Sequence, residues 1–125
     1  MAIKDDIYTF LVANTTITSL VPSSQIGWID VDEIDDYPKI VYQMISSPVL
    51  YESIDEWQRW RFYCFSHSKT ECRDIGVALI DLLHGLTDTM GDTYISLIIK
   101  IDESEVTRLE NIYEKYIDFR IIYNG

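Results

Sequence analysis

The sequence contains few cysteines, glycines and prolines: two, five and three among 125 residues. Two cysteines do not suggest the disulfide framework of a small secreted domain, and a reducing compartment is the default expectation. Because the five glycines are scattered, there is no glycine-rich phosphate-binding loop. No apolar run approaches the roughly 20 residues of a membrane span, and the first residues turn polar at once instead of forming a secretory leader. We therefore expect a soluble protein that is made in the cytoplasm and does not contact a membrane.

Basic residues are also scarce. Ten Lys and Arg residues stand against 21 Asp and Glu residues, which gives a formal net charge of −11. Proteins that bind duplex DNA directly rely on Lys and Arg to neutralise phosphates, so this balance argues against that class. It is compatible with solubility, with a basic protein partner, or with a surface that must not adhere to DNA.

No catalytic, cofactor-binding or metal-binding motif is evident. Four side chains are of zinc-ligand type: Cys64, His67, Cys72 and His84. The last two would lie about 18 Å apart on one helix, so the four cannot share one zinc ion. Both cysteines fall on apolar faces, which predicts small core residues. Ser66 and His67 are neighbours on a strand and point to opposite faces, and no G-x-S-x-G elbow is present. We expect no enzyme activity.

Residues 57–86 are the stretch around which the chain is organised. Positions 57–66 alternate as in a strand with one buried face, with Trp60, Phe62 and Cys64 on one side and Arg59, Arg61 and Tyr63 on the other. We expect the two arginines to pair with nearby acids rather than to bind phosphate. Ser68 and Glu71 then match a capping box, in which each side chain accepts a backbone N–H from the other residue. Apolar residues at helical spacing follow, and Gly85 is placed to end the helix.

The other segments fit a sheet that this helix covers. We expect a short helix over 3–14, a connection over 15–24, and strands over 26–30, 39–47, 94–102 and 116–123. In 94–102, Ile95, Leu97, Ile99 and Ile101 are expected on one face. Residues 86–93 are expected to form a loop, and 103–113 are ambiguous, with a short strand around 106–109 as one interpretation. Hairpin-length joins favour an α+β fold, one domain over 1–125: mainly antiparallel β-sheet with two helices packed on one face, a two-layer sandwich.

Two connecting segments are candidates for an interface or a channel lining. The first holds five acids in seven positions: Asp30, Asp32, Glu33, Asp35 and Asp36. It lacks the central glycine and the distal glutamate of a calcium-binding EF-hand loop, so a solvated acidic loop is the simplest interpretation. The second joins two strands over 47–56 and is longer than a hairpin requires, which indicates a use in contacts. Its candidate residues are Tyr51, Glu52, Asp55 and Glu56.

Several segments, taken in order, resemble the tail-completion family of long-tailed bacteriophages, the tail terminator or tail-to-head joining proteins. They are the N-terminal helix, Ile17-Thr18-Ser19-Leu20-Val21, Ile26-Gly27-Trp28, the proline-led strand from Tyr37-Pro38 to Gln43, the strand Trp60 to Phe65, the helix Ile75 to Gly85, and the ending Tyr116 to Tyr123. The aromatic-proline strand opening and the aromatic-Asp-Phe-Arg ending are the most specific of these. The run at 30–36 contains more acidic residues than the family pattern leads us to expect.

The resemblance implies a structural virion protein of a siphovirus-type phage, made in the bacterial cytoplasm, with neither catalysis nor a cofactor. Such proteins form a ring, commonly of six subunits, on the head-proximal end of the tail tube. The ring ends tube polymerisation and joins the tail to the neck of the head. The implied partners are further copies of the chain, the tail tube protein and a head-neck connector or stopper. Genome DNA would pass through without specific binding.

Two alternatives remain open at this point. A head-closure stopper or another neck protein belongs to the same structural class. An acidic DNA mimic that occupies a host nuclease or repressor belongs to another. Such a mimic requires its acids in a duplex-like double row on one face, whereas here the acids are spread over many predicted elements.

Overall fold

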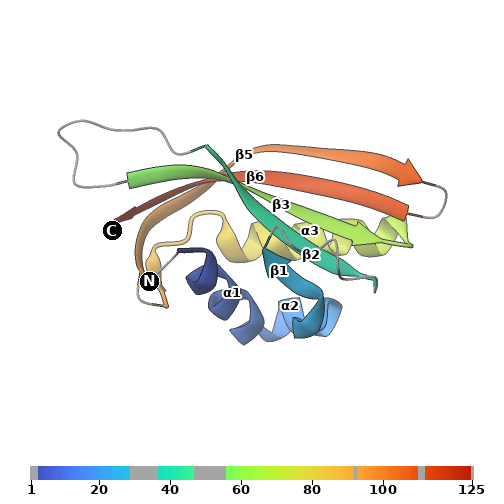
Figure 1. Cartoon of the computed structure of the whole chain (residues 1–125), viewed down its shortest axis with the longest axis horizontal. Helices are drawn as coiled ribbons and strands as arrows, with labels where there is room; N and C mark the ends of the chain where they lie inside the picture. Colours follow the sequence, from blue (N-terminus) through green and yellow to red (C-terminus); the bar gives the residue numbers. More distant parts are fainter. Residues whose placement is uncertain (1–2, 29–36, 47–55, 92, 110–111, 125) are drawn as a thin grey trace.

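The computed structural model describes residues 3–28, 37–46, 56–91, 93–109 and 112–124 (Figure 1). Its elements follow in this order: α1 (Ile3–Ala13), α2 (Thr15–Leu20), the short 3-10 turn η1 (Ser23–Gln25), β1 (Ile26–Trp28), β2 (Lys39–Ser46), β3 (Glu56–Ser66), α3 (Lys69–Leu83), β4 (Asp88–Met90), β5 (Thr93–Leu109) and β6 (Ile112–Asn124). The described strands form a six-stranded sheet in the order β1-β2-β3-β6-β5-β4. No helix in these ranges combines the length and apolarity needed to cross a bilayer.

The sheet is mixed and curled, which corrects the expected two-layer antiparallel sandwich with two helices. β1 runs parallel to β2, with Ile26 beside Ile40, and the other neighbouring strands are antiparallel. No tight hairpin joins β1 to β2, because positions 29–38 separate them, so the antiparallel direction is not imposed on this pair. Both outer strands, β1 and β4, contact α1. The sheet therefore curls as a half-barrel around a layer of helices that lies on one of its faces (Figure 1).

The core lies between this helical layer and the inner face of the sheet. α3 packs against β3, β5 and β6, and α2 packs against α3. The inner face carries the apolar residues that the alternation predicts, all of them buried: Trp60, Phe62 and Cys64 on β3, and Ile117, Phe119, Ile121 and Tyr123 on β6. Helical residues at the predicted spacing meet them: Ile7 and Leu11 on α1, and Cys72, Ile75, Leu79 and Leu83 on α3.

Residues 15–20 form a helix where the sequence predicted a connection. The Asn14 side chain caps this helix, since its Oδ1 accepts the Ile17 N–H at 3.0 Å. Asn is among the best N-cap residues, because its side chain satisfies one of the free N–H groups of the first turn. Ile17 and Val21 are buried, and Leu20 is partly buried against the core.

The β4–β5 hairpin and the length of β5 also differ from expectation. Residues 88–90 pair with 93–95 instead of forming a loop, and β5 continues through the ambiguous segment to Leu109. The register shifts between Ile95 and Leu97 and again between Lys100 and Asp102. Each bulge adds one residue and reverses the alternation that follows it. Ile95 and Ile98 are therefore the buried residues, and the prediction that the four alternating apolar residues share one face is wrong.

Candidate interaction surface on the helix-free face

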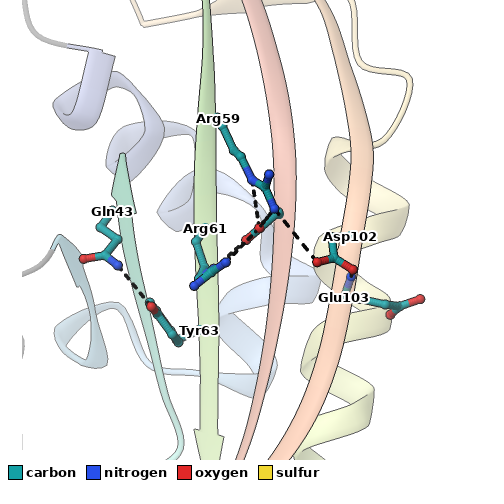
Figure 2. A network of polar contacts seen from close by, with 7 residues as sticks. Gln43, Arg59, Arg61, Tyr63, Asp102 and Glu103 are labelled. Carbon is teal, nitrogen blue, oxygen red and sulfur yellow. Dashed lines mark hydrogen bonds and ion pairs between the residues drawn. The ribbon is translucent and has the colours of Figure 1, made fainter. Parts of the chain in front are cut away.

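The outer face of the sheet has no helix against it in the described chain (Figure 1). Figure 2 looks onto the strands from this side. Strand alternation and the β3–β6 register place a set of aromatic and charged side chains there. We call it the helix-free face and define it by Lys39 and Gln43 of β2, Trp57, Arg59, Arg61, Tyr63 and Phe65 of β3, Glu114, Tyr116, Asp118, Arg120 and Ile122 of β6, and Asp102 of β5.

An ion-pair network around Asp118 occupies the centre of this face. Arg59 donates to Asp118 Oδ2 from Nε at 3.0 Å and from Nη2 at 2.5 Å. Arg61 donates from Nε to Oδ1 at 2.7 Å and from Nη2 to Oδ2 at 3.0 Å. Asp102 extends the network from β5, 3.9 Å from Arg59 Nη2 (Figure 2). The predicted pairing of the two arginines with acids is confirmed.

Asp118 is 0% exposed although no helix covers it, because the two guanidinium groups lie over it. Burial raises the pKa of an isolated carboxyl group, but the hydrogen bonds from Arg61 and Arg59 outweigh that effect, and the pKa of Asp118 is lowered. The carboxylate is charged at neutral pH, and both of its oxygens already accept hydrogen bonds. This geometry suits a structural anchor rather than a base or a metal ligand.

Aromatic rings and further cations surround the network. The Arg61 guanidinium lies 4.3 Å from the Tyr116 ring centroid, and that of Arg120 lies 4.4 Å from the Trp57 ring centroid. Tyr63 stacks on Phe65 with centroids 6.0 Å apart and accepts a hydrogen bond from Gln43 Nε2 at 3.0 Å (Figure 2). Trp, Tyr and Arg are the residues that dominate the energetic centres of protein interfaces. The face therefore has the composition of a protein-binding surface.

The helix-free face differs in charge from the rest of the molecule. Its described side chains are four basic (Lys39, Arg59, Arg61 and Arg120) and three acidic (Asp102, Glu114 and Asp118), a formal sum of 4 − 3 = +1. The whole chain carries −11, so the remainder carries −11 − 1 = −12. Cations thus gather on this face of an otherwise acidic protein, which favours an acidic partner surface.

A small apolar pocket of about 180 Å³ lies on the other side of the sheet, near the N-terminus of α1. Its lining residues are Ile3, Lys4, Trp28, Met44, Gln58 and Trp60. Lys4 Nζ lies 4.1 Å from the centroid of the Trp28 ring, and Trp60 Nε1 donates to Gln58 Oε1 at 2.9 Å. The pocket has room for one side chain rather than for an extended ligand.

The interface candidates predicted from sequence fall almost entirely outside the described residues. This holds for Asp30, Asp32, Glu33, Asp35, Asp36, Tyr51, Glu52 and Asp55. Glu56 begins β3, where it pairs with Tyr123, but its side chain is not among those described. All nine residues remain predictions.

The helix-free face as a surface was not predicted. The alternation does place Arg59 and Arg61 on the polar side of one strand, and Asp118 and Arg120 on the polar side of another. Only the pairing of β3 with β6 brings the two sets together, with Arg61 directly opposite Asp118. A single sequence contains no signal for that pairing.

Three of the four residues of zinc-ligand type, Cys64, Cys72 and His84, make contacts within the fold. Cys64 and Cys72 are buried, as predicted, and Cys72 Sγ donates to the Cys64 carbonyl oxygen at 3.2 Å. Burial raises the pKa of Cys72 to about 11, so the thiol is protonated at neutral pH. His84 Nδ1 accepts the Lys100 N–H at 3.0 Å. Within the described ranges no three His, Cys, Asp or Glu side chains are grouped so as to hold a metal ion.

Comparisons with known proteins give a structural match. No family model and no curated protein matches the sequence. Among solved structures, the fold is similar to that of a chain in the virion of a native gene transfer agent particle, with a TM-score of 0.75. The match covers 99% of this chain and 96% of that one, at 11% sequence identity. The two chains share a fold over nearly their whole lengths.

Proposed function

We propose that this chain is a structural protein of a phage-like virion that completes the tail. In this role it forms a ring, of six subunits by analogy with the family it resembles, on the head-proximal end of the tail tube. The ring stops tube polymerisation and offers a docking surface to the connector or stopper of the neck. The protein would be located at the tail-neck junction, and it would act through protein contacts without catalysis or a cofactor.

The observation that carries this proposal is the full-length similarity in fold to a chain of a virion. It agrees with the tail-completion pattern, which also spans nearly the whole sequence. The helix-free face adds a physical reason, because its Trp, Tyr and Arg residues suit binding to another protein. The chain's net charge of −11 gives a second reason, because an acidic ring would repel DNA phosphates and let the genome slide through.

The test is electron microscopy of a lysate from the source phage after deletion of this gene, with the wild-type gene supplied in trans as the control. We expect filled heads beside unattached tails, with tails of uncontrolled length. Unattached tails of normal length beside heads that have lost DNA would instead assign the chain to head closure. Intact virions with normal tails would contradict both roles, and a host DNA-binding protein would then be the partner to look for.

A further inference from the structure

One face of the sheet has a partner layer and the other has none. A sheet normally buries both faces against helices, or leaves a polar one to water. The helix-free face fits neither case, because no helix of the described chain covers it and it is not simply polar. Its half-buried Trp57, Tyr63 and Tyr116 rings lie between guanidinium groups. This face therefore suits a helix from another subunit.

The unpaired charge on this face is positive. Arg59 and Arg61 are committed to Asp118. Arg120 lies over Trp57 and makes no ion pair with any residue of the described chain. A carboxylate from a partner surface would pair with Arg120. The formal charge of the face, +1 against −12 for the rest of the chain, also favours an acidic partner surface.

The chain itself carries a surface of the opposite kind. Asp74, Val77 and Asp81 follow one another at helical spacing along α3, on the side away from its buried Ile75 and Leu79. We call these three residues the outer stripe of α3. Val77 is 54% exposed, the largest fraction among the exposed large hydrophobic residues of the described chain. Neither aspartate has an ion-pair partner within the described ranges, whereas the neighbouring Arg73 pairs with Glu105 at 3.0 Å.

We infer that the outer stripe of α3 in one subunit packs on the helix-free face of the next subunit. The inference rests on the proposed ring. The acids of the stripe would face Arg120, and Val77 would meet the aromatic rings. Because α3 lies on the opposite side of the sheet from the helix-free face, each copy presents one surface to each neighbour (Figure 1). Such a contact is heterologous, and it forms a ring when the rotation between successive copies closes.

The test uses charge reversal on each surface. The stripe variant carries Asp74→Arg and Asp81→Arg, and the face variant carries Arg120→Glu. A third variant with Asp5→Arg and Asp88→Arg, exposed acids away from the stripe, has the same change in charge and serves as the control. Sedimentation velocity measures self-association of each purified chain, alone and with tail tubes. We expect each reversal to weaken self-association about tenfold or more, and the control to behave as the wild type does.

An equal mixture of the stripe and face variants gives the sharpest result. In each variant alone the contact opposes like charges, whereas in the mixture the wild-type stripe meets the wild-type face and the reversed stripe meets the reversed face. We therefore expect the mixture to regain the self-association that each variant has lost. Trp57→Ala, which removes a ring and no charge, is a second face variant in case Arg120→Glu fails to fold, as judged by circular dichroism.

Several results would overturn the inference. Reversals that leave self-association unchanged would do so, as would a wild-type chain that stays monomeric both alone and on tail tubes. Variants that self-associate normally but fail to attach to tubes or necks would assign the face to another virion protein. Salt-sensitive retention of duplex DNA by the wild type, lost with Arg120→Glu, would assign it to nucleic acid. If gene deletion leaves virions intact but the mixture of variants still regains self-association, the proposed function fails and the contact stands.

Discussion

At the scale of single residues, Asp118 explains how a bare sheet face holds its shape. A fully buried carboxylate is costly unless its oxygens are satisfied. Here two arginines from the adjacent strand satisfy it while keeping part of their own surface in water, with 35% of the Arg59 side chain and 26% of the Arg61 side chain exposed. The aromatic rings then pack against side chains that are already fixed in place. The network therefore pre-organises the surface that we assign to subunit contact.

The Asp118→Asn variant tests this anchor. Because the folded state lowers the pKa of Asp118, its charge stabilises the fold above the ordinary aspartate pKa of about 4, and that contribution is lost as the pH falls through the lowered value. We expect the variant to lose about 2–4 kcal/mol of unfolding free energy at neutral pH, since the two guanidinium groups lose the opposing charge and an NH2 donor replaces one of the two acceptor oxygens. The difference from the wild type should shrink below about pH 4. Urea unfolding across pH measures it.

The matched control is Asp102→Asn. Its side chain is 52% exposed and 3.9 Å from Arg59, so we expect a change within about 0.5 kcal/mol. Equal losses for the two variants would show that the network does not depend on the buried position.

The sequence allowed part of this site to be predicted. The spacing of Arg59 and Arg61 on a polar strand side indicated ion pairing, and the structure confirms it. The acid that pairs with the two arginines could not be predicted, because the sequence contains 21 acids and only the β3–β6 register selects Asp118. Contacts between positions so far apart in sequence leave no local pattern.

At the scale of elements, local signals predicted the beginning and the end of α3 with one difference in the cap. Ser68 Oγ accepts the Glu71 N–H at 3.3 Å, as expected. The Glu71 carboxylate, however, accepts a hydrogen bond from Ser66 Oγ at 2.6 Å, and Ser66 Oγ in turn accepts the Ser68 N–H at 3.0 Å. The last residue of β3 thus completes the capping box. The strand and the helix are joined by a side chain as well as by the backbone.

The elements that the sequence missed depend on distant contacts. β4 is three residues long and, among the strands that the structure describes, pairs only with the start of β5. Its turn is held against α1, where Thr93 Oγ1 donates to the buried Asp6 at 2.5 Å. Gly91 in the turn has a φ of +59°, and a Cβ there would overlap the Asp6 carboxylate. Asp6 therefore links the first helix to the β4–β5 turn at one edge of the sheet.

A comparison of Gly91→Ala with Gly85→Ala tests this contact between Asp6 and the turn. Gly85 also has a positive φ, +82°, but nothing lies within 4 Å of a Cβ built on it. We expect Gly85→Ala to cost about 1 kcal/mol of unfolding free energy, from backbone strain alone. Gly91→Ala adds displacement of Asp6 from Thr93, so a loss of about 2–4 kcal/mol is expected. Equal losses measured by urea unfolding would show that the Asp6 contact contributes nothing.

At the scale of the whole molecule, many basic side chains are paired within the chain, whereas the excess of acids is not. The basic side chains are largely consumed internally, as Lys100 and Lys115 pair with Glu103, and Arg73 pairs with Glu105. The excess of acids is left to solvent or to partners. Six copies would carry a formal charge of 6 × −11 = −66. In a ring around a DNA channel, such a charge would keep the genome from adhering.

The acidic run at 30–36 is the densest source of that charge, so its neutralisation tests the channel hypothesis. We expect a phage carrying Asp32→Asn, Glu33→Gln, Asp35→Asn and Asp36→Asn to eject DNA more slowly or to join tails to heads less efficiently. The physical reason is the weaker repulsion of phosphates where DNA passes, or the loss of charge facing a neck partner. Ejection triggered in vitro and counts of joined particles by electron microscopy measure the two effects.

The effect of lowering the protein's net charge must be distinguished from the effect of removing charge from the acidic run at 30–36. Asp35→Asn with Asp36→Asn is therefore compared with Asp5→Asn and Asp88→Asn, exposed acids of α1 and β4 that remove the same charge elsewhere. A defect confined to the first pair would support a channel or neck role for the acidic run. Equal defects would point to the charge of the ring as a whole, which is not expected if screening limits repulsion to about a Debye length, about 8 Å at physiological salt. Normal ejection and joining in the fourfold variant would leave the acidic run without either role, and the helix-free face would then be the surface on which assembly depends.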